Sequence, residues 1–186
     1  MTPPGPVEAT WNVVATLSED TFRDAVRLLG RWGKVKRTHF YNVLAMRVED
    51  PAGFLRDFTA AVGESPGLLN TVSHVMPGQR MFDFATREEF EQKARDIVFA
   101  WVPDLRGASF YVRLHRRGYK GVLSSQPEER LLDEALLQAL AEAGTPGRIN
   151  FEDADKMIQI ETIDGRAAVS LWTREDRQRC PFLGID

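Results

Sequence analysis

The stretch Phe110–Gly121 combines an alternating pattern with a basic, glycine-containing turn. Its first six residues alternate between apolar side chains and side chains that carry charge or hydrogen-bonding groups, which is the period of a β-strand. Between Leu105 and Pro127 there are five Lys or Arg residues and no Asp or Glu. Because the chain as a whole is acidic, this local excess of positive charge predicts an anionic partner.

A helix is predicted to begin directly after this turn. Ser125-Gln126-Pro127-Glu128 has the form of a capping box, in which the serine hydroxyl and the glutamate carboxylate bond to backbone N–H groups at the helix start. The first turn of a helix offers free N–H groups and partial positive charge. The basic turn and the helix start are therefore a candidate phosphate site, although a solvated basic loop has the same pattern.

A second basic stretch lies nearer the N-terminus. Ala25–Val48 holds six Lys or Arg residues and no acid, whereas the 186-residue chain has a formal net charge of −3. Positive charge is thus segregated, which favours binding of a specific polyanion over general adsorption to nucleic acid. Lys34, Lys36 and Arg37 either extend an anion-binding groove or protect an exposed strand edge, as lysines often do.

Composition bounds the class of protein. A hydrophobic content of 43% supports a substantial core in one large or two small domains. The sequence has no apolar run long enough to span a membrane and no secretory signal pattern, so we expect a cytoplasmic protein. Its single cysteine, Cys180, excludes an internal disulfide and a cysteine-built zinc site.

The N-terminal half predicts a ferredoxin-like domain over residues 10–84, preceded by a flexible tail at residues 1–9. Strand and helix patterns follow one another in the order βαβαβ, with helices covering one side of a small sheet, within an α+β protein. The predicted elements are strands at residues 11–17, 40–48, 70–76 and 79–84, and helices beginning near Phe22 and Pro51.

The C-terminal half predicts a second domain over residues 85–175. Thr86–Glu89 is another capping-box pattern that opens a helix, and a second helix runs from about residue 126 to 143. Asp164-Gly165 then joins two strand patterns in a hairpin. Residues 176–186 are expected to form a loosely packed, mixed-charge tail.

Most catalytic signatures are absent from the sequence. There is no phosphate-binding G-x-x-x-x-G-K-[ST] loop, no G-x-G-x-x-G, no H-E-x-x-H and no G-x-S-x-G. The three histidines, His39, His74 and His115, fall in different predicted elements. We therefore predict no catalytic residues, no metal site and no cofactor.

The segment Phe110–Gly118, the helix after it, and the strand Asp155–Glu161 with its hairpin partner resemble a THUMP domain, an RNA-binding module of tRNA-modifying proteins. The Val-x-x-x-Arg-Arg-Gly core at Val112–Gly118 is most similar to stand-alone THUMP proteins related to the tRNA cytidine-acetylation adaptor. The resemblance covers roughly residues 80–175, and in that family a ferredoxin-like domain precedes THUMP. Relatives often have a proline directly before the aspartate that begins this strand, whereas this chain has Ala154.

The resemblance implies a noncatalytic protein that binds the acceptor stem and 3′ end of tRNA and presents it to a separate tRNA-modifying enzyme, such as an acetyltransferase. It places Arg113, Arg116 and Arg117 on the basic positions of the family, although Arg113 has an alternative as an ion pair with Glu161. The predicted RNA-binding residues are Arg113, His115, Arg116, Arg117, Tyr119, Lys120, Lys34, Lys36 and Arg37. A protein-interaction module and an enzyme subunit of unrecognised activity remain as alternatives.

Overall fold

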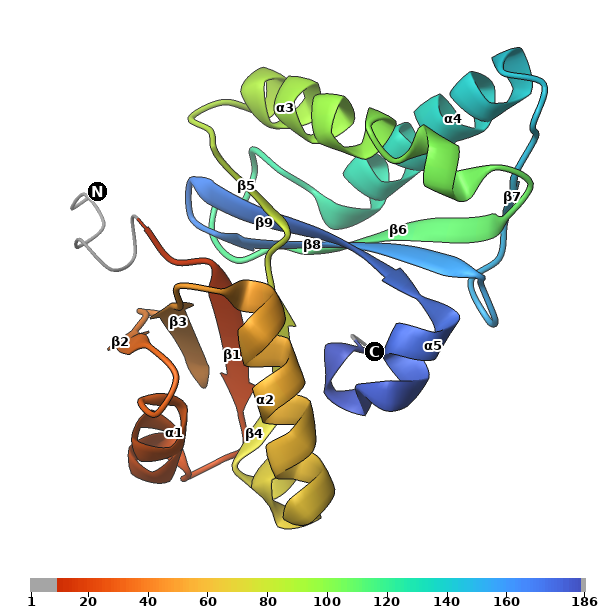
Figure 1. Cartoon of the computed structure of the whole chain (residues 1–186). Coiled ribbons are helices and arrows are strands. Elements are labelled where there is room, and N and C mark those ends of the chain that lie inside the picture. Colours follow the sequence, from red (N-terminus) through yellow and green to blue (C-terminus); the bar gives the residue numbers. More distant parts are fainter. Residues whose placement is uncertain (1–9, 185–186) are drawn as a thin grey trace. The chain divides into compact units, whose positions relative to one another are not determined.

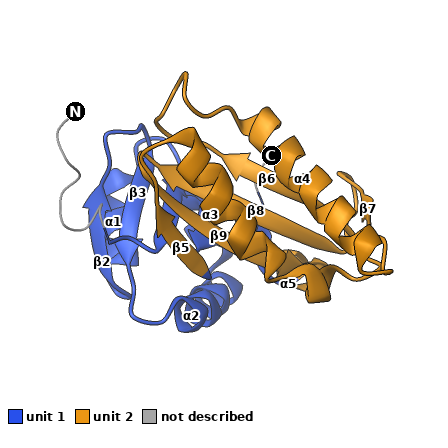
Figure 2. Ribbon diagram, turned by 90° about the horizontal axis from the view of Figure 1, so that it is seen from above, with its two compact units in different colours: residues 1–79, 179–186 blue, residues 80–178 orange. Residues whose placement is uncertain are grey.

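The computed structural model describes residues 10–184, which form two compact units (Figure 2). The first unit comprises the chain up to Gln79 together with the residues from Arg179 onward, and the second comprises Arg80–Gln178. Each unit contains one β-sheet and helices, so the predicted α+β class is confirmed. None of the described helices is long and apolar enough to cross a membrane. The predicted tail at residues 1–9 lies outside the described residues.

The first unit is built on a four-stranded antiparallel sheet with the order β2-β3-β1-β4. Its elements, in chain order, are β1 (Val13–Leu17), α1 (Phe22–Leu29), β2 (Lys34–Arg37), β3 (Val43–Arg47), α2 (Pro51–Glu64), the 3₁₀ helix η1 (Pro66–Asn70) and β4 (Val72–Pro77). β1 and β3 are almost wholly buried because they are the two central strands. Pro51 occupies the first turn of α2, where its missing N–H costs no hydrogen bond.

The basic run before the second predicted strand is itself a strand. The sequence had placed one strand over residues 40–48, but the structure has β2 at Lys34–Arg37 and β3 at Val43–Arg47, joined by a turn. Asn42 enables this turn, since its φ of 54° lies in the left-handed region that asparagine tolerates better than most residues. As an edge strand, β2 carries lysines where they discourage pairing with another chain.

The end of the described chain is not a loosely packed tail. Cys180, Phe182 and Leu183 are buried, and the last two belong to a short 3₁₀ helix, η3 (Pro181–Leu183). The rings of Phe58 in α2 and Phe182 are 4.8 Å apart, edge to face. A loosely packed tail would expose these apolar side chains to water. Because they are buried, the segment completes the core of the first unit.

The second unit contains a five-stranded sheet with the order β5-β9-β8-β6-β7. β6 pairs in parallel with β7 and β8, whereas β8-β9 and β5-β9 are antiparallel. Helices α3 and α4 cover one face of this sheet (Figure 1). The elements are β5 (Arg80–Asp83), α3 (Arg87–Phe99), the 3₁₀ helix η2 (Val102–Leu105), β6 (Ser109–His115), α4 (Ser125–Glu142), β7 (Arg148–Ile149), β8 (Lys156–Ile163), β9 (Arg166–Thr173) and α5 (Arg174–Arg179).

Alternation along β6 separates two environments. Phe110, Val112 and Leu114 are buried in the core beneath α3 and α4, and the intervening side chains point to the other face. The hairpin predicted at Asp164-Gly165 joins β8 to β9. The strand predicted over residues 79–84 was expected in the sheet of the first unit. In the structure it is β5, which pairs with β9 in the sheet of the second unit.

The two predicted capping boxes have different outcomes. At α3 the Thr86 hydroxyl accepts a hydrogen bond from the Glu89 N–H at 3.2 Å, and the Glu89 carboxylate accepts from the Ala85 N–H at 2.8 Å, as the pattern predicts. At α4 the N-cap is Ser124 and makes no side-chain capping bond. Glu128 is buried and pairs with Arg87 of α3, so the capping prediction at Ser125 is wrong.

Candidate nucleic-acid interface

Arg117, at the centre of the predicted RNA-binding turn, is buried. Its guanidinium forms an ion pair with the Glu161 carboxylate on β8, and its Nη2 lies 3.3 Å from His115 Nδ1. The backbone is fixed as well, because the Arg117 N–H donates to the Thr162 hydroxyl at 3.0 Å. With a side chain only 6% exposed, Arg117 joins the turn to the sheet and does not present its charge at the surface.

The rest of the turn packs against the β8-β9 hairpin. The Asp164 N–H donates to the Arg117 carbonyl at 2.8 Å. Gly118 has a φ of +87°, and a Cβ at this position would lie 2.5 Å from Asp164 Oδ1, so glycine is required. Tyr119 packs its ring 5.1 Å from that of Phe84, and Arg116 donates to the Gly118 carbonyl. The sequence predicts that the Tyr119 ring stacks on RNA. In the structure the ring packs against Phe84 and stabilises the turn.

Arg113 and His115 lie on the face of β6 that points away from α3 and α4. The Arg113 guanidinium lies 3.7 Å from Glu129 Oε2 of α4 and 5.5 Å from the Tyr111 ring centroid. Its register partner on β8 is Gln159, so the predicted alternative pairing with Glu161 is wrong. His115 Nδ1 instead lies 3.9 Å from Glu161 Oε1. Both side chains are partly exposed but already have protein partners.

Carboxylates of α4 bind the backbone of β6. Asp133 Oδ1 accepts a hydrogen bond from the Val112 N–H at 2.9 Å, and Glu129 Oε1 accepts one from the Leu114 N–H at 2.7 Å. Burial raises the pKa of the Asp133 carboxyl to about 7, against the opposing effect of the Val112 hydrogen bond. β7 pairs with β6 only at Ser109 and Phe110. Beyond that point the two carboxylates accept the hydrogen bonds of the β6 N–H groups that β7 does not reach.

The helix start predicted as a phosphate site already contains a carboxylate. Glu128 Oε1 lies 2.8 Å from Arg87 Nε, and Arg87 Nε is also 2.8 Å from Glu91 Oε1. Burial, together with hydrogen bonding to Glu91, raises the pKa of the Glu128 carboxyl to about 7. The first turn of α4 is thus engaged with α3 through its own acidic side chain.

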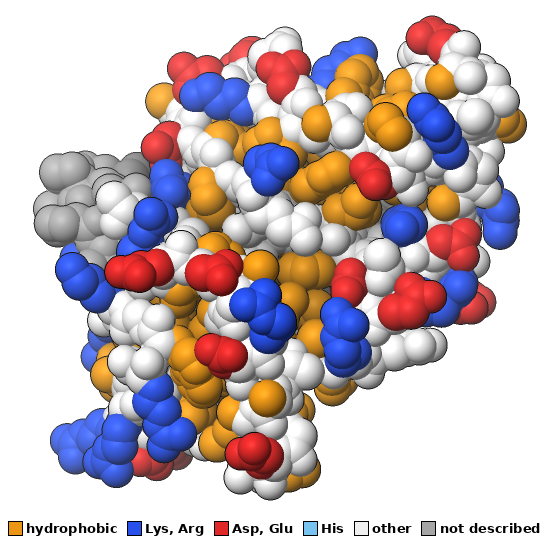
Figure 3. Space-filling model, in the orientation of Figure 1, with side chains coloured by type: hydrophobic (Ala, Val, Ile, Leu, Met, Phe, Trp, Pro, Cys, Tyr) orange, Lys and Arg blue, Asp and Glu red, His pale blue; other side chains and the backbone are white. Residues whose placement is uncertain are grey.

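The first unit presents a different kind of basic surface. We use the term α1–β2 surface for six cations on α1, on β2 and on the segment between them: Arg23, Arg27, Arg31, Lys34, Lys36 and Arg37. Their charged groups make no hydrogen bond or ion pair with any residue in the described part of the chain, 10–184. All except the half-buried Lys36 are exposed. Figure 3 shows Lys and Arg side chains gathered over α1 and β2.

Exposed aromatic side chains adjoin this surface. Tyr41, in the β2-β3 turn, is 79% exposed, and Phe22, at the start of α1, is 37% exposed. The Arg37 guanidinium carbon lies 5.1 Å from the Phe22 ring centroid, a cation–π contact. The α1–β2 surface therefore combines free positive charge with accessible aromatic faces. The structure assigns Lys34, Lys36 and Arg37 to the first unit and the other six predicted residues to the second.

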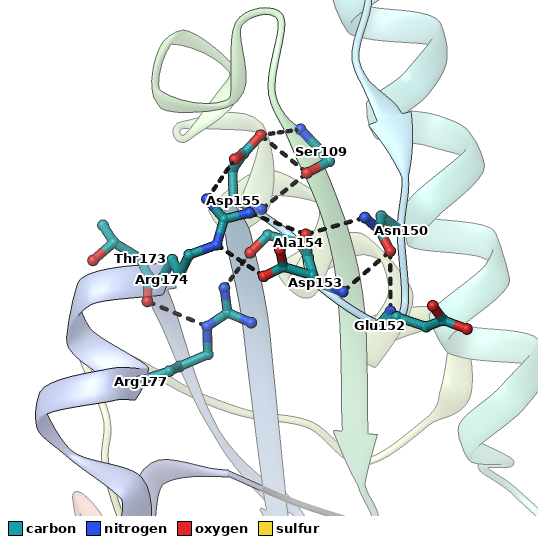
Figure 4. Close-up of polar contacts among 9 residues, drawn as sticks. All are labelled: Ser109, Asn150, Glu152, Asp153, Ala154, Asp155, Thr173, Arg174 and Arg177. Atoms are coloured by element: carbon teal, nitrogen blue, oxygen red, sulfur yellow. Dashed lines mark hydrogen bonds and ion pairs between the residues drawn. The ribbon is translucent and has the colours of Figure 1, made fainter.

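Asp155, the aspartate at the start of the strand pattern in the THUMP resemblance, belongs to a network of hydrogen bonds and ion pairs. Asp155 Oδ2 accepts hydrogen bonds from the Ser109 N–H at 2.8 Å and the Ser109 hydroxyl at 3.0 Å (Figure 4). Arg174 Nη1 lies 3.2 Å from Asp155 Oδ1, and Arg174 Nε 2.9 Å from Asp153 Oδ1. The Ser109 hydrogen bonds hold the pKa of the Asp155 carboxyl below its usual value. This network joins β6, β8 and α5.

Sequence reasoning missed three members of this interface. Phe22 and Arg23 precede the basic stretch Ala25–Val48, and Tyr41 falls within the strand predicted over residues 40–48, so none of the three is predicted as a binding residue. The i, i+4 spacing of Arg23 and Arg27 could have revealed that these two cations share one face of α1. Among residues 10–184, no group of three His, Cys, Asp or Glu side chains could hold a metal ion.

Comparison with known proteins shows the fold. No family model and no curated protein matches the sequence. The structure is similar to PH1313 from Pyrococcus horikoshii, with a TM-score of 0.56 and 13% identity over 87% of this chain and 54% of that one. It is similar to TrmN from Thermus thermophilus, with a TM-score of 0.55 and 19% identity over 86% of this chain and 44% of that one. The chain thus spans about half the length of these proteins and has a THUMP-like fold.

The prediction that the chain is noncatalytic is contradicted by these comparisons. The fold occurs in TrmN, a methyltransferase. The absence of familiar catalytic motifs is therefore not evidence against an enzyme, because the same fold forms part of TrmN, a longer methyltransferase chain.

Proposed function

We propose that this chain binds tRNA as a subunit of a tRNA-modification enzyme. The observation that carries the proposal is the α1–β2 surface, where six cations have no ion-pair partner among the described residues. Phosphate contacts dominate the affinity of nucleic-acid-binding proteins, and a cation that is not already paired gives up no internal partner when it binds a phosphate. A formal net charge of −3 for the whole chain disfavours general adsorption of nucleic acid, so we expect binding at locally basic surfaces such as this one.

The THUMP resemblance of Val112–Gly118 supports tRNA as the polyanion and the acceptor stem with the 3′ end as the region bound. The first unit supports the same reading, and we infer that it is a ferredoxin-like domain, since its elements follow the order βαββαβ. From the second stretch, the proposal retains Arg113, His115, Arg116 and Lys120 as contacts and treats Arg117 and Tyr119 as positioning residues. A partner enzyme, such as an acetyltransferase, also acts on the bound tRNA in the cytoplasm.

A direct test is the binding of the purified protein to total tRNA, to tRNA trimmed of its 3′ single-stranded end, and to a DNA duplex, across a salt series. The variant Lys34→Gln/Lys36→Gln removes two charges from the α1–β2 surface. Its matched control, Arg95→Gln/Arg130→Gln, removes two exposed charges from α3 and α4. We expect the first variant to reduce the slope of log K against log salt by about 1.5–2, and the control to leave it unchanged.

Preference for intact tRNA over the other two ligands would support recognition of the acceptor end. Two outcomes contradict the proposal. If the wild-type protein binds none of the ligands, or binds all three equally, the chain is not a tRNA-binding subunit. If both double variants lose the same affinity, the effect arises from total charge and the α1–β2 surface has no special part in it.

A further inference from the structure

A cavity beside the start of α1 has the composition of a nucleotide site. It has a volume of about 520 Å³ and lies between the first turn of α1 and the β2-β3 turn. This volume is within the ~300–1,000 Å³ range of small-molecule sites. Its lining includes the aromatic residues Phe22 and Tyr41, the basic residues Arg23 and Arg37, and the acidic residues Asp20 and Asp24.

The two aromatic residues differ in exposure: the Tyr41 side chain is largely in solvent, whereas the Phe22 ring lies against Arg37. Tyr41 is 79% exposed, and no described residue makes a hydrogen bond with its hydroxyl or a ring–ring contact with it. Burial of such a ring does not stabilise this fold, because almost all of its surface remains in water. Phe22 forms another wall with the Arg37 guanidinium above its ring at 5.1 Å. An unpaired nucleobase stacks on exposed aromatic and guanidinium planes of this kind.

The turn that carries Tyr41 is ordered by its own hydrogen bonds. The Thr38 hydroxyl donates to the Val43 carbonyl at 2.9 Å and accepts from the Phe40 N–H at 3.1 Å. Asn42 completes the turn in the left-handed region, with a φ of 54°. These contacts hold the backbone around Tyr41 before any ligand binds, which reduces the conformational entropy that binding would remove.

We propose that this cavity binds one unpaired nucleotide of RNA, an inference that rests on the proposed RNA-binding function. The base stacks against Tyr41 and Phe22, and its phosphates contact Arg23 and Arg37. Asp20 and Asp24 accept hydrogen bonds from an exocyclic amino group of the base, as carboxylates do from N4 of cytosine. Uracil has no such group, so the cavity favours cytosine over uracil.

The probes for a test are fluorescein-labelled RNA pentamers of cytidine and of uridine, a blunt RNA duplex, and free CMP. In the wild-type protein we expect the cytidine pentamer to bind more tightly than the uridine pentamer and CMP. Tyr41→Ala should weaken binding of the cytidine pentamer about tenfold and change duplex binding by less than about twofold. Asp20→Asn/Asp24→Asn should reduce the preference for cytidine over uridine.

Phe151→Ala is the matched control, because Phe151 is a 62% exposed aromatic residue of the second unit. It should leave all affinities unchanged, and thermal unfolding should confirm that both aromatic variants are folded. Equal losses in Tyr41→Ala and Phe151→Ala, or none in Tyr41→Ala, would overturn the proposed cavity. CMP binding as tight as that of the pentamer would identify a free nucleotide as the ligand and overturn the RNA assignment.

The outcomes separate this inference from the proposed function. Binding of tRNA and duplex without any effect of Tyr41→Ala on the cytidine pentamer would remove the cavity and leave the tRNA-binding surface. Tight pentamer binding that depends on Tyr41, without tRNA binding, would keep the nucleotide cavity and reject the tRNA-binding subunit. Absence of binding to every probe would overturn both.

Discussion

The two basic stretches of this protein look alike in sequence and differ in structure. Of the six cations in Ala25–Val48, five make no side-chain hydrogen bond or ion pair with a described residue; the sixth, Arg47, donates to the Thr10 carbonyl. Of the five in Leu105–Pro127, Arg113, Arg116 and Arg117 are engaged within the protein. A count of charges therefore identifies basic segments but does not distinguish cations that stabilise the fold from cations available to a ligand.

The difference follows from where each stretch lies. The first occupies the exposed face of α1 and the edge strand β2, with no acidic residue within the stretch. The second includes β6, an interior strand flanked by β8 and β7, and the carboxylates of Glu129 and Glu161 reach it from α4 and β8. Those acids lie outside the stretch in sequence. Tertiary structure thus neutralises a segment that is uniformly basic when read alone.

The largest expected effect concerns Arg117. Arg117→Ala should lower the free energy of unfolding by about 3–5 kcal/mol, because it leaves the buried Glu161 carboxylate without its cation. Urea denaturation measures this change. Lys120→Ala, an exposed cation of the same turn, should change stability by less than about 0.5 kcal/mol. Equal stability of the two variants would show that the second stretch is not built into the fold.

The next effect tests the α4 carboxylates that bind β6. The folded-state pKa of Asp133 is raised to about 7 from its ordinary value of 3.8, so the folded state retains a proton that the unfolded state has released. This contribution to stability is fully present below about pH 4 and is lost as the pH rises through about 7. Asp133 is surrounded by the Val112 N–H, Glu129, Arg113 and Glu134.

We expect wild-type stability to fall between pH 5 and pH 8 by more than that of Asp133→Asn, with a difference on the order of 2–4 kcal/mol. Asparagine can still accept the Val112 hydrogen bond through its Oδ1 atom and has no proton to release. Urea midpoints at the two pH values provide the comparison. Glu128 shifts in the same direction and stays in both proteins, so its effect cancels. Identical pH dependence in the two proteins would contradict the prediction.

A smaller effect is expected where the turn meets the β8-β9 hairpin. Gly118→Ala adds a Cβ 2.5 Å from Asp164 Oδ1 at a φ of +87°, whereas Gly121→Ala adds one at +85° with no atom within 4 Å. Both variants bear left-handed strain of about 1–3 kcal/mol, and only the first also displaces a neighbour. Thermal unfolding should therefore show Gly118→Ala as the less stable of the two. The opposite order would mean that the hairpin does not restrict the turn.

The features of the fold that the sequence predicts correctly are those set by residues close together in the chain. The alternation of β6, the hairpin at Asp164-Gly165 and the cap at Thr86 are local patterns, and the structure confirms them. Pairing of β5 with β9 and packing of Phe182 on Phe58 join segments more than 80 residues apart in sequence, and no local pattern encodes them. The same limit explains the site: the burial of Arg117 depends on Glu161, a distant residue in the chain.

The smallest effects come from single cations, and they compare the two stretches most directly. Arg27→Gln should weaken tRNA binding about two- to fivefold and reduce the slope of log K against log salt by about 0.7–0.9, because this exposed cation has no internal partner. Arg113→Gln should cost less affinity, since Arg113 must give up part of its interaction with Glu129 to contact a phosphate. Anisotropy titrations with labelled tRNA at several salt concentrations measure both quantities. If Arg113→Gln changes the slope more than Arg27→Gln does, then an internally paired cation contributes more to tRNA binding than a free one, and pairing within the protein is the wrong criterion for choosing between the two surfaces.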